Sequence, residues 1–265
     1  MNHEEFVRVS DNSTTAVLMI HGILGTPRYF DKWMSVIPQE WSVYNMLLDG
    51  HGKTVKDFSK SSMEKWQKQV AGQLAVMREK HERIVVIAHS MGALLAMEAA
   101  MENGHKIHSM ILLGVPLKIA IKPSVIDAAF RVIWGCVDEK NPAATAMKNA
   151  YSIEPDRHLW RYLGWIPRYR ELLKLIKKVR NEIHRIAVPC QIIQSRQDEL
   201  ISEKTETYLK RNLLLRHQVL EKSSHYYYEE TDFTYLLEQA GESLRELEEI
   251  PAGPVVRGGM PFLHM

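Results

Sequence analysis

Short runs of apolar, largely β-branched residues alternate along the chain with longer segments in which apolar residues recur every three or four positions. The short runs have the length and composition of buried strands, and the longer segments have the period of helices. This alternation is typical of a mostly parallel sheet whose strands are joined by crossover helices. The predicted strands are residues 16–20, 43–48, 84–88, 110–113, 191–194 and 218–220, with a short stub at 5–9 upstream.

The longer segments predict three helices that pack on this sheet, at residues 63–77, 92–101 and 232–248. One interval breaks the alternation, because residues 117–187 have helical patterns over a length far beyond an ordinary crossover connection. An inserted helical subdomain explains this interval. The predicted organisation is an α/β core of residues 1–116 and 188–250, a cap at 117–187 and a C-terminal tail at 251–265.

Residues 168–186 of the insert place apolar side chains at alternating spacings of four and three, which predicts a helix with one apolar stripe. We expect this helix to bury the stripe on the core and to expose its basic side chains. The members of the stripe are Leu172, Ile176, Val179, Ile183 and Ile186. The insert is also rich in aromatic residues, which we expect to form its core, with a few lining an acyl pocket. These are Trp134, Trp160, Tyr162, Trp165 and Tyr169.

The segment Ala88-His89-Ser90-Met91-Gly92 joins a predicted buried strand to a predicted helix. A serine hydroxyl is presented by so sharp a turn only when the residues two before and two after it are small, as Ala88 and Gly92 are. The N-terminus of the following helix directs its positive end at the reacting oxygen. The segment predicts Ser90 as a nucleophile. The alternative is an ordinary helix-capping serine beside a small residue.

A second glycine-containing segment, His21-Gly22-Ile23-Leu24-Gly25, follows the first predicted strand. Glycines at this place allow backbone N–H groups to turn toward the serine and to stabilise a tetrahedral oxyanion. We expect the amides of Ile23 and Met91 to form this oxyanion hole. An ordinary glycine-rich turn is the alternative, and a phosphate loop is excluded because no Gly-Lys-Ser/Thr follows.

A nucleophilic serine requires a histidine base and a carboxylate that orients the base. In a strand–turn–helix context of this kind the expected chain order is serine, then Asp or Glu, then histidine. Asp198 follows the fifth predicted strand, with Glu199 as its close rival, and His225 follows the sixth. Other histidines flank turns and are interpreted as structural: His21, His51 and His89.

The segments HGILG, DGHG, AHSMG, SRQDELI and SSH occur in this order and span nearly the whole chain. They resemble the small α/β-hydrolase carboxylesterases and monoacylglycerol-lipase-like enzymes. The resemblance implies the α/β-hydrolase fold, a cap over the serine, an acyl-enzyme mechanism on a carboxylic ester, and no metal or organic cofactor. The roles that it implies are Ser90 as nucleophile, Asp198 as acid, His225 as base, and the Ile23 and Met91 amides as oxyanion hole.

Composition adds limits on partners and compartment. The net charge of +2 is too small to indicate nucleic-acid binding, although the insert alone carries fourteen Lys and Arg against seven Asp and Glu. We expect the basic side chains of the insert to form a solvated face; weak contact with an anionic membrane surface, or attraction of an anionic substrate, is the alternative. Two cysteines build no disulfide framework, and no apolar run is long enough to span a bilayer. With a polar, acidic start and no signal peptide, we expect a cytoplasmic protein.

Several functions remain open at this point, because the same triad serves different substrates. A thioesterase, an acyltransferase, a C–C bond hydrolase or a peptidase are alternatives to an esterase of short to medium acyl esters or monoacylglycerols. A non-catalytic protein that binds a small ligand under the cap is a further alternative, and it predicts a damaged triad. The sequence does not indicate the oligomeric state.

Overall fold

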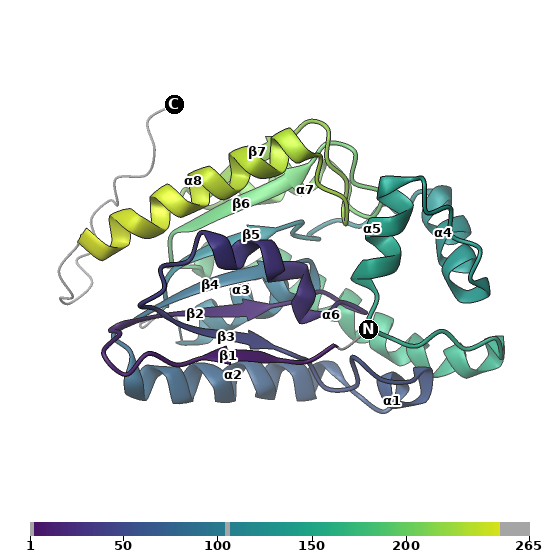
Figure 1. The fold of residues 1–265 in the computed structure, drawn as a ribbon, viewed down its shortest axis with the longest axis horizontal. Helices are drawn as coiled ribbons and strands as arrows, with labels where there is room; N and C mark the ends of the chain where they lie inside the picture. The colour runs from purple at the N-terminus through teal and green to yellow at the C-terminus, as the bar shows by residue number, and fades with distance from the viewer. Residues whose placement is uncertain (1–2, 104–106, 250–265) are drawn as a thin grey trace.

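The computed structural model describes residues 3–103 and 107–249, which contain one seven-stranded sheet (Figure 1). The strand order is β1-β3-β2-β4-β5-β6-β7, and of the described strands β1 alone runs antiparallel to its neighbour. All six predicted strands and the upstream stub are present, so the mostly parallel sheet is confirmed. The strands are β1 (Phe6–Arg8), β2 (Thr15–Ile20), β3 (Ser42–Met46), β4 (Arg83–His89), β5 (Ile107–Leu113), β6 (Cys190–Ser195) and β7 (Leu215–Leu220).

The central strands β2, β4 and β5 are buried almost entirely, and each therefore has a continuous apolar run in the sequence. Their parallel register places Ile20 opposite Ala88 and Ala88 opposite Leu112. The carboxyl ends of these strands consequently meet at one edge of the sheet. The segments that leave this edge bring together residues that are far apart in the sequence.

Helices cover both faces of the sheet, and alternate residues of β2 point to the two faces. Leu18 belongs to the apolar cluster under α2, α3 and α6, whereas Met19 belongs to the cluster under η1 and α8. In Figure 1, α8 lies along one side of the sheet and α2 along the other. The helices outside the insert are η1 (Pro27–Ser35), α1 (Val55–Ser59), α2 (Met63–Lys80), α3 (Met91–Asn103), α7 (Thr205–Leu209) and α8 (Glu230–Glu249).

The insert between β5 and β6 is helical, as the sequence predicts. Its predicted apolar stripe is buried at every position, with exposed fractions of 7% or less. The long helix begins at Ile166 and ends at Glu182, so the last two residues of the stripe lie in and just after the following 3-10 turn. The elements of the insert are α4 (Pro123–Trp134), α5 (Pro142–Ala150), η3 (Leu159–Trp165), α6 (Ile166–Glu182) and η4 (Ile183–Arg185).

Polar contacts attach α6 to the core along its length. The Arg168 guanidinium donates to the carbonyl of Ser59 at 2.7 Å, and the Glu171 carboxylate accepts the N–H of Met63 at 2.9 Å. Farther along the helix, Lys178 Nζ lies 2.8 Å from the Glu98 carboxylate on α3. These contacts fix both the position and the direction of α6 on the core.

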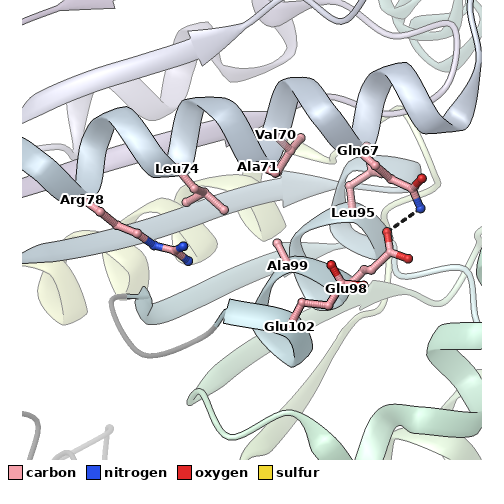
Figure 2. A pocket seen from close by; sticks show the side chains of 9 residues that line it. All are labelled: Gln67, Val70, Ala71, Leu74, Arg78, Leu95, Glu98, Ala99 and Glu102. Atoms are coloured by element: carbon pink, nitrogen blue, oxygen red, sulfur yellow. Dashed lines mark hydrogen bonds between the residues drawn. The ribbon is translucent and has the colours of Figure 1, made fainter.

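Glu98 is 5% exposed and lies in the groove between α2 and α3 (Figure 2). Its carboxylate accepts a hydrogen bond of 2.7 Å from the Gln67 amide, drawn in Figure 2, as well as the bond from Lys178. A buried charge needs such partners, because an unpaired one costs several kcal/mol. The groove is therefore explained as the place where three helices are joined through one carboxylate.

The expectation that the aromatic residues of the insert form its core is wrong for three of them. Trp134, Trp160 and Tyr169 are 47%, 66% and 40% exposed, whereas Tyr162 and Trp165 pack against the core cluster. Trp165 is also held by its indole N–H, which donates to the carbonyl of Val55. Tyr169 nevertheless lies close enough to Tyr151 and Tyr226 to interact with both electrostatically.

The C-terminal helix predicted at residues 232–248 is α8, which begins two residues earlier. The predicted tail, residues 251–265, lies outside the described residues. Within the described ranges, no helix combines the length and the apolar character needed to cross a membrane.

Candidate active site

Ser90 lies in the turn between β4 and α3 with a backbone φ of +53°, a left-handed conformation that is strained for a residue with a side chain. Its N–H donates to the carbonyl of Leu113 at 2.9 Å, which ties the turn to the next strand. A Cβ on Gly92 would lie 2.1 Å from the carbonyl oxygen of Ile20. Glycine is therefore required at this position, as the steric argument from the sequence predicts.

The turn after β2 approaches Ser90 equally closely. A Cβ on Gly22 would lie 2.9 Å from the Cβ of Ser90, so the backbone here can come close only because this residue is glycine. Ile23 follows it and lines the same pocket as Ser90, and Met91 is the first residue of α3. Both predicted oxyanion residues are thus next to the serine. Their role remains a prediction.

The structure brings together the three residues predicted to form the triad, from the segments that follow β4, β6 and β7. The Ser90 hydroxyl lies 3.1 Å from His225 Nε2, and His225 Nδ1 lies 2.8 Å from Asp198 Oδ2. An ionised carboxylate can only accept, so Nδ1 carries the proton of the neutral imidazole. Nε2 is then free to accept the hydrogen bond of the serine hydroxyl. The three side chains are buried, with exposed fractions of 8% or less for their residues.

Asp198 is held firmly in the loop after β6. Its second oxygen, Oδ1, accepts the backbone N–H groups of Leu200 and Ile201, each at 2.8 Å. Burial alone would raise the pKa of Asp198, but the charge of His225 and these hydrogen bonds lower it below its ordinary value. Asp198 is therefore ionised near neutral pH and can orient the imidazole.

The pKa of His225 is shifted in the opposite direction to that of Asp198. Burial alone would lower the pKa of His225, but the charge and hydrogen bond of Asp198, together with the charge of Glu199, raise it above its ordinary value. A base with a raised pKa is a stronger proton acceptor at neutral pH. The arrangement favours transfer of the serine proton to Nε2.

From the sequence, Glu199 is an alternative to Asp198 as the triad carboxylate, and His89 is interpreted as a structural residue. The structure gives each a contact with the main chain of His225: the carboxylate of Glu199 accepts its N–H at 3.0 Å, and His89 Nε2 donates to its carbonyl at 3.1 Å. No pattern in the sequence indicates these contacts. The one signal is position, because each residue adjoins a member of the triad.

A small pocket opens beside the serine and holds about 240 Å³ of space, counting its open mouth. One of its walls is Ala150, the last residue of α5, so the insert reaches the serine. Tyr29 and Tyr226 were not singled out from the sequence, although they also line the pocket. The lining residues are His21, Gly22, Ile23, Gly25, Tyr29, His89, Ser90, Ala150 and Tyr226.

Among the described residues, no group of three His, Cys, Asp or Glu side chains is arranged to hold a metal ion. His21 beside the site is engaged by the backbone, because its Nε2 accepts the N–H of Leu48 at 3.1 Å. Burial lowers the pKa of His21 to about 4, and it is therefore neutral at physiological pH.

Comparison with known proteins agrees with this geometry. Residues 11–232 match the profile of a hydrolase family described as serine aminopeptidase, S33. No curated protein matches the sequence. Solved structures match over nearly the full chain, at identities that show the fold alone.

Three of these structures illustrate the range of similar enzymes. The metagenome-derived lipolytic enzymes LipS and LipT are represented by a chain with a TM-score of 0.70 and 20% identity, covering 92% of this chain and 98% of that one. The monoacylglycerol lipase of Paleococcus ferrophilus has a TM-score of 0.66 and 16% identity, covering 91% and 98%. The enol-lactonase of Burkholderia xenovorans has a TM-score of 0.62 and 14% identity, covering 90% and 95%.

Proposed function

The chain belongs to the serine aminopeptidase S33 family of α/β-hydrolases, and on this premise we propose that it is a serine hydrolase that cleaves carboxylic esters of short to medium acyl chains. The observation that carries the proposal is the hydrogen-bond chain from Ser90 Oγ through His225 to Asp198, with distances of 3.1 and 2.8 Å. A protein that only binds a ligand has no need for this alignment.

The reaction proceeds through an acyl-enzyme on Ser90. His225 Nε2 takes the hydroxyl proton as Oγ attacks the carbonyl carbon, and the negative charge of the tetrahedral intermediate lies against the amides of Ile23 and Met91. The imidazolium then protonates the leaving alcohol. Water, deprotonated by the same Nε2, attacks the acyl carbon, releases the acid and restores the serine hydroxyl. Asp198 keeps the imidazole in the required tautomer throughout.

The residues that line the pocket favour an ester substrate over a peptide with a free N-terminal amine. An aminopeptidase needs a carboxylate to receive the free α-amine of its substrate, and none of the nine described lining residues is Asp or Glu. The space beside the serine that the centre of a water molecule can occupy is only about 10 Å³, which favours a short acyl group. A thioester differs from an ester only in the leaving atom, so a thioesterase is the nearest alternative.

The insert acts as a cap in this proposal. Ala150 forms one wall of the pocket, and the N–H of Ser152 donates to the carbonyl of Leu24 in the turn after β2. The cap would therefore set the length and shape of the acyl group that the serine can reach.

Cys136 and Cys190 are both free thiols, which agrees with a reducing compartment such as the cytoplasm.

The test is hydrolysis of p-nitrophenyl esters of increasing acyl length, with matched p-nitrophenyl thioester and amino-acid p-nitroanilide substrates. We expect the wild type to cleave the esters with an optimum at short acyl length. Ser90→Ala is expected to lower kcat by at least about 10⁴-fold, since the nucleophile is lost. Turnover that survives in Ser90→Ala, or faster cleavage of the anilides than of every ester, would contradict the proposal.

We further propose weak contact of the insert with an anionic lipid surface. The exposed face of α4 carries Ile126, Phe130 and Trp134, which are 57%, 48% and 47% exposed, and Lys118 and Lys122 precede the helix. Apolar side chains that enter the interface and nearby lysines that meet anionic headgroups act together in such binding.

Vesicle co-sedimentation tests this contact. We expect binding to vesicles that contain phosphatidylserine, and weaker binding to phosphatidylcholine alone. Ile126→Ser with Phe130→Ser is expected to reduce the bound fraction. Leu213→Ser, at a 96% exposed leucine in a loop distant in sequence, is expected to leave it unchanged. Binding that does not depend on the anionic lipid would contradict the contact.

A further inference from the structure

The catalytic base of the proposed reaction lies in a loop rather than in a helix or strand. His225 is in the segment between β7 and α8, which contains bends but no helix or strand. Placing an imidazole within a few tenths of an ångström of a serine hydroxyl from such a segment requires that its main chain be held.

Both polar groups of the His225 main chain are bound by side chains from the other two triad segments. Its N–H donates to Glu199 Oε2 at 3.0 Å, and its carbonyl accepts from His89 Nε2 at 3.1 Å. Glu199 directly follows Asp198 in the chain, and His89 directly precedes Ser90. Glu199 and His89, each adjacent in sequence to another triad residue, thus both bind the main chain of His225.

The surroundings of His89 fix its ring so that Nε2 donates to the carbonyl of His225. It is 3% exposed, and its ring stacks on Tyr29 with centroids 4.2 Å apart. Tyr29 is held in turn, because its hydroxyl donates to that of Tyr228 at 2.9 Å. Burial, and then the nearby His225, lower the pKa of His89 well below its ordinary value, so the ring is neutral. A carbonyl only accepts, so the single ring proton of His89 is on Nε2.

Glu199 differs from His89 because it brings a charge as well as a hydrogen bond. Its carboxylate is the acceptor for the main chain of His225, and its negative charge favours the imidazolium form of the same residue. The other groups that face His225 are Asp198 on the same loop as Glu199, His89 and Ser90 at the end of β4, and the neighbouring Tyr226.

Resting on the proposed function, we propose that Glu199 and His89 are positioning residues that together hold the main chain of His225 between the nucleophile and acid segments, and that Glu199 also stabilises the protonated base. Neither residue is needed to complete the hydrogen-bond chain of the triad. Both act through His225, and their loss is expected to lower kcat. We expect little change in KM, because Glu199 does not line the pocket and His89→Phe keeps an aromatic ring in the pocket wall.

Four variants separate the two contributions, measured as kcat, KM and their pH profiles on a p-nitrophenyl ester that the wild type cleaves. Glu199→Gln keeps an acceptor for the N–H but loses the charge. Glu199→Ala loses both. His89→Phe keeps the ring against Tyr29 but loses the donor, and Glu203→Ala removes an exposed carboxylate from the same loop as a control.

We expect Glu199→Ala and His89→Phe to lower kcat by about 10–100-fold, with KM within about twofold, since small displacements of a reacting group have effects of this size. In Glu199→Gln, kcat on the high-pH plateau is largely kept. The acidic limb of the profile moves to lower pH, because the imidazolium has lost a stabilising charge. The ratio of variant to wild-type rate therefore rises as the pH falls, which a purely structural role would not produce.

A measurement without substrate keeps the inference separate from the proposed function. The His225 Nδ1 proton, bound to Asp198, is expected to give a low-field proton NMR signal whose titration reports the pKa of His225. Glu199→Gln is expected to lower that pKa, and Glu199→Ala and His89→Phe are expected to broaden or shift the signal. Folded variants, judged by circular dichroism, with wild-type kcat, pH profile and NMR signal would overturn the proposal, whether or not the esterase assignment holds.

Discussion

Helices α4 and α6 of the insert are both amphipathic, but the core holds only one of them. α6 buries Leu172, Leu175, Ile176 and Val179 and makes ion pairs or hydrogen bonds with three segments of the core. In the fully described helix α4, none of the residues Pro123–Trp134 is buried. Figure 1 shows α4 at the far end of the insert, away from the sheet.

An apolar stripe specifies a helix and one of its faces, but it does not specify what covers that face. In α6 the stripe is covered by the core, and the helix is part of the folded structure. In α4 the stripe faces outward, which fits the contact with an anionic lipid surface proposed above.

The largest expected difference is in local stability. A helix of twelve residues with no fully buried side chain is marginal in water, whereas a packed helix opens only with much of the protein. We expect the amides of α6 to be protected from hydrogen exchange at least about 100-fold more than those of α4, a difference of about 3 kcal/mol. Hydrogen exchange read by mass spectrometry or NMR measures this. Equal protection would mean that the contrast is wrong.

A truncation in each helix gives the next effect. Leu175 is 3% exposed and Ile126 is 57% exposed. Leu175→Ala is expected to lower the free energy of unfolding by about 2–5 kcal/mol, because it leaves a cavity under α6. Ile126→Ala is expected to change it by about 0.5 kcal/mol or less, since the side chain is in solvent. Urea denaturation measures both, and a similar loss in the two variants would contradict the prediction.

The carboxylates of the two regions differ in the same sense. Glu98→Ala removes the buried partner of Gln67 and Lys178, and we expect a loss of about 1–3 kcal/mol in the free energy of unfolding. Asp127 on α4 pairs with Arg131 in solvent, with both side chains more than half exposed. Asp127→Ala is expected to cost less than about 0.5 kcal/mol. A cost for Asp127→Ala that matches that of Glu98→Ala would show that α4 is held after all.

The smallest effect concerns pH. The hydrogen bond from Arg168, and that from the Met63 N–H, lower the pKa of Glu171 on α6, although partial burial opposes them. A lowered pKa means that the contribution to stability is complete above the ordinary pKa of about 4.3 and is lost as the pH falls through the lowered value. Glu171→Gln is therefore expected to be destabilised by less than about 1 kcal/mol near neutral pH, a gap that closes on acidification. A gap that stays constant or widens in acid would refute this.

Local patterns were sufficient for the sheet and for the proposed triad. The parallel strands are buried on both faces, so each appears in the sequence as a continuous apolar run, a pattern that is not typical of loops. Ser90 was identifiable because its turn demands small neighbours, and Asp198 and His225 because they follow strand ends in the expected order. The rivalry between Asp198 and Glu199 could not be resolved from the sequence, because both adjoin the same strand end.

The chain order and periodicity of this protein therefore determined its strands, its insert and the three residues that meet at the site, since these depend on the repeat of the backbone and on where strands end. The outward face of α4, the exposed tryptophans and the contacts of Glu199 and His89 with the main chain of His225 depended on the tertiary structure. They arise between segments that are distant in the sequence, and a main-chain N–H or carbonyl looks the same at every residue until folding places a partner beside it.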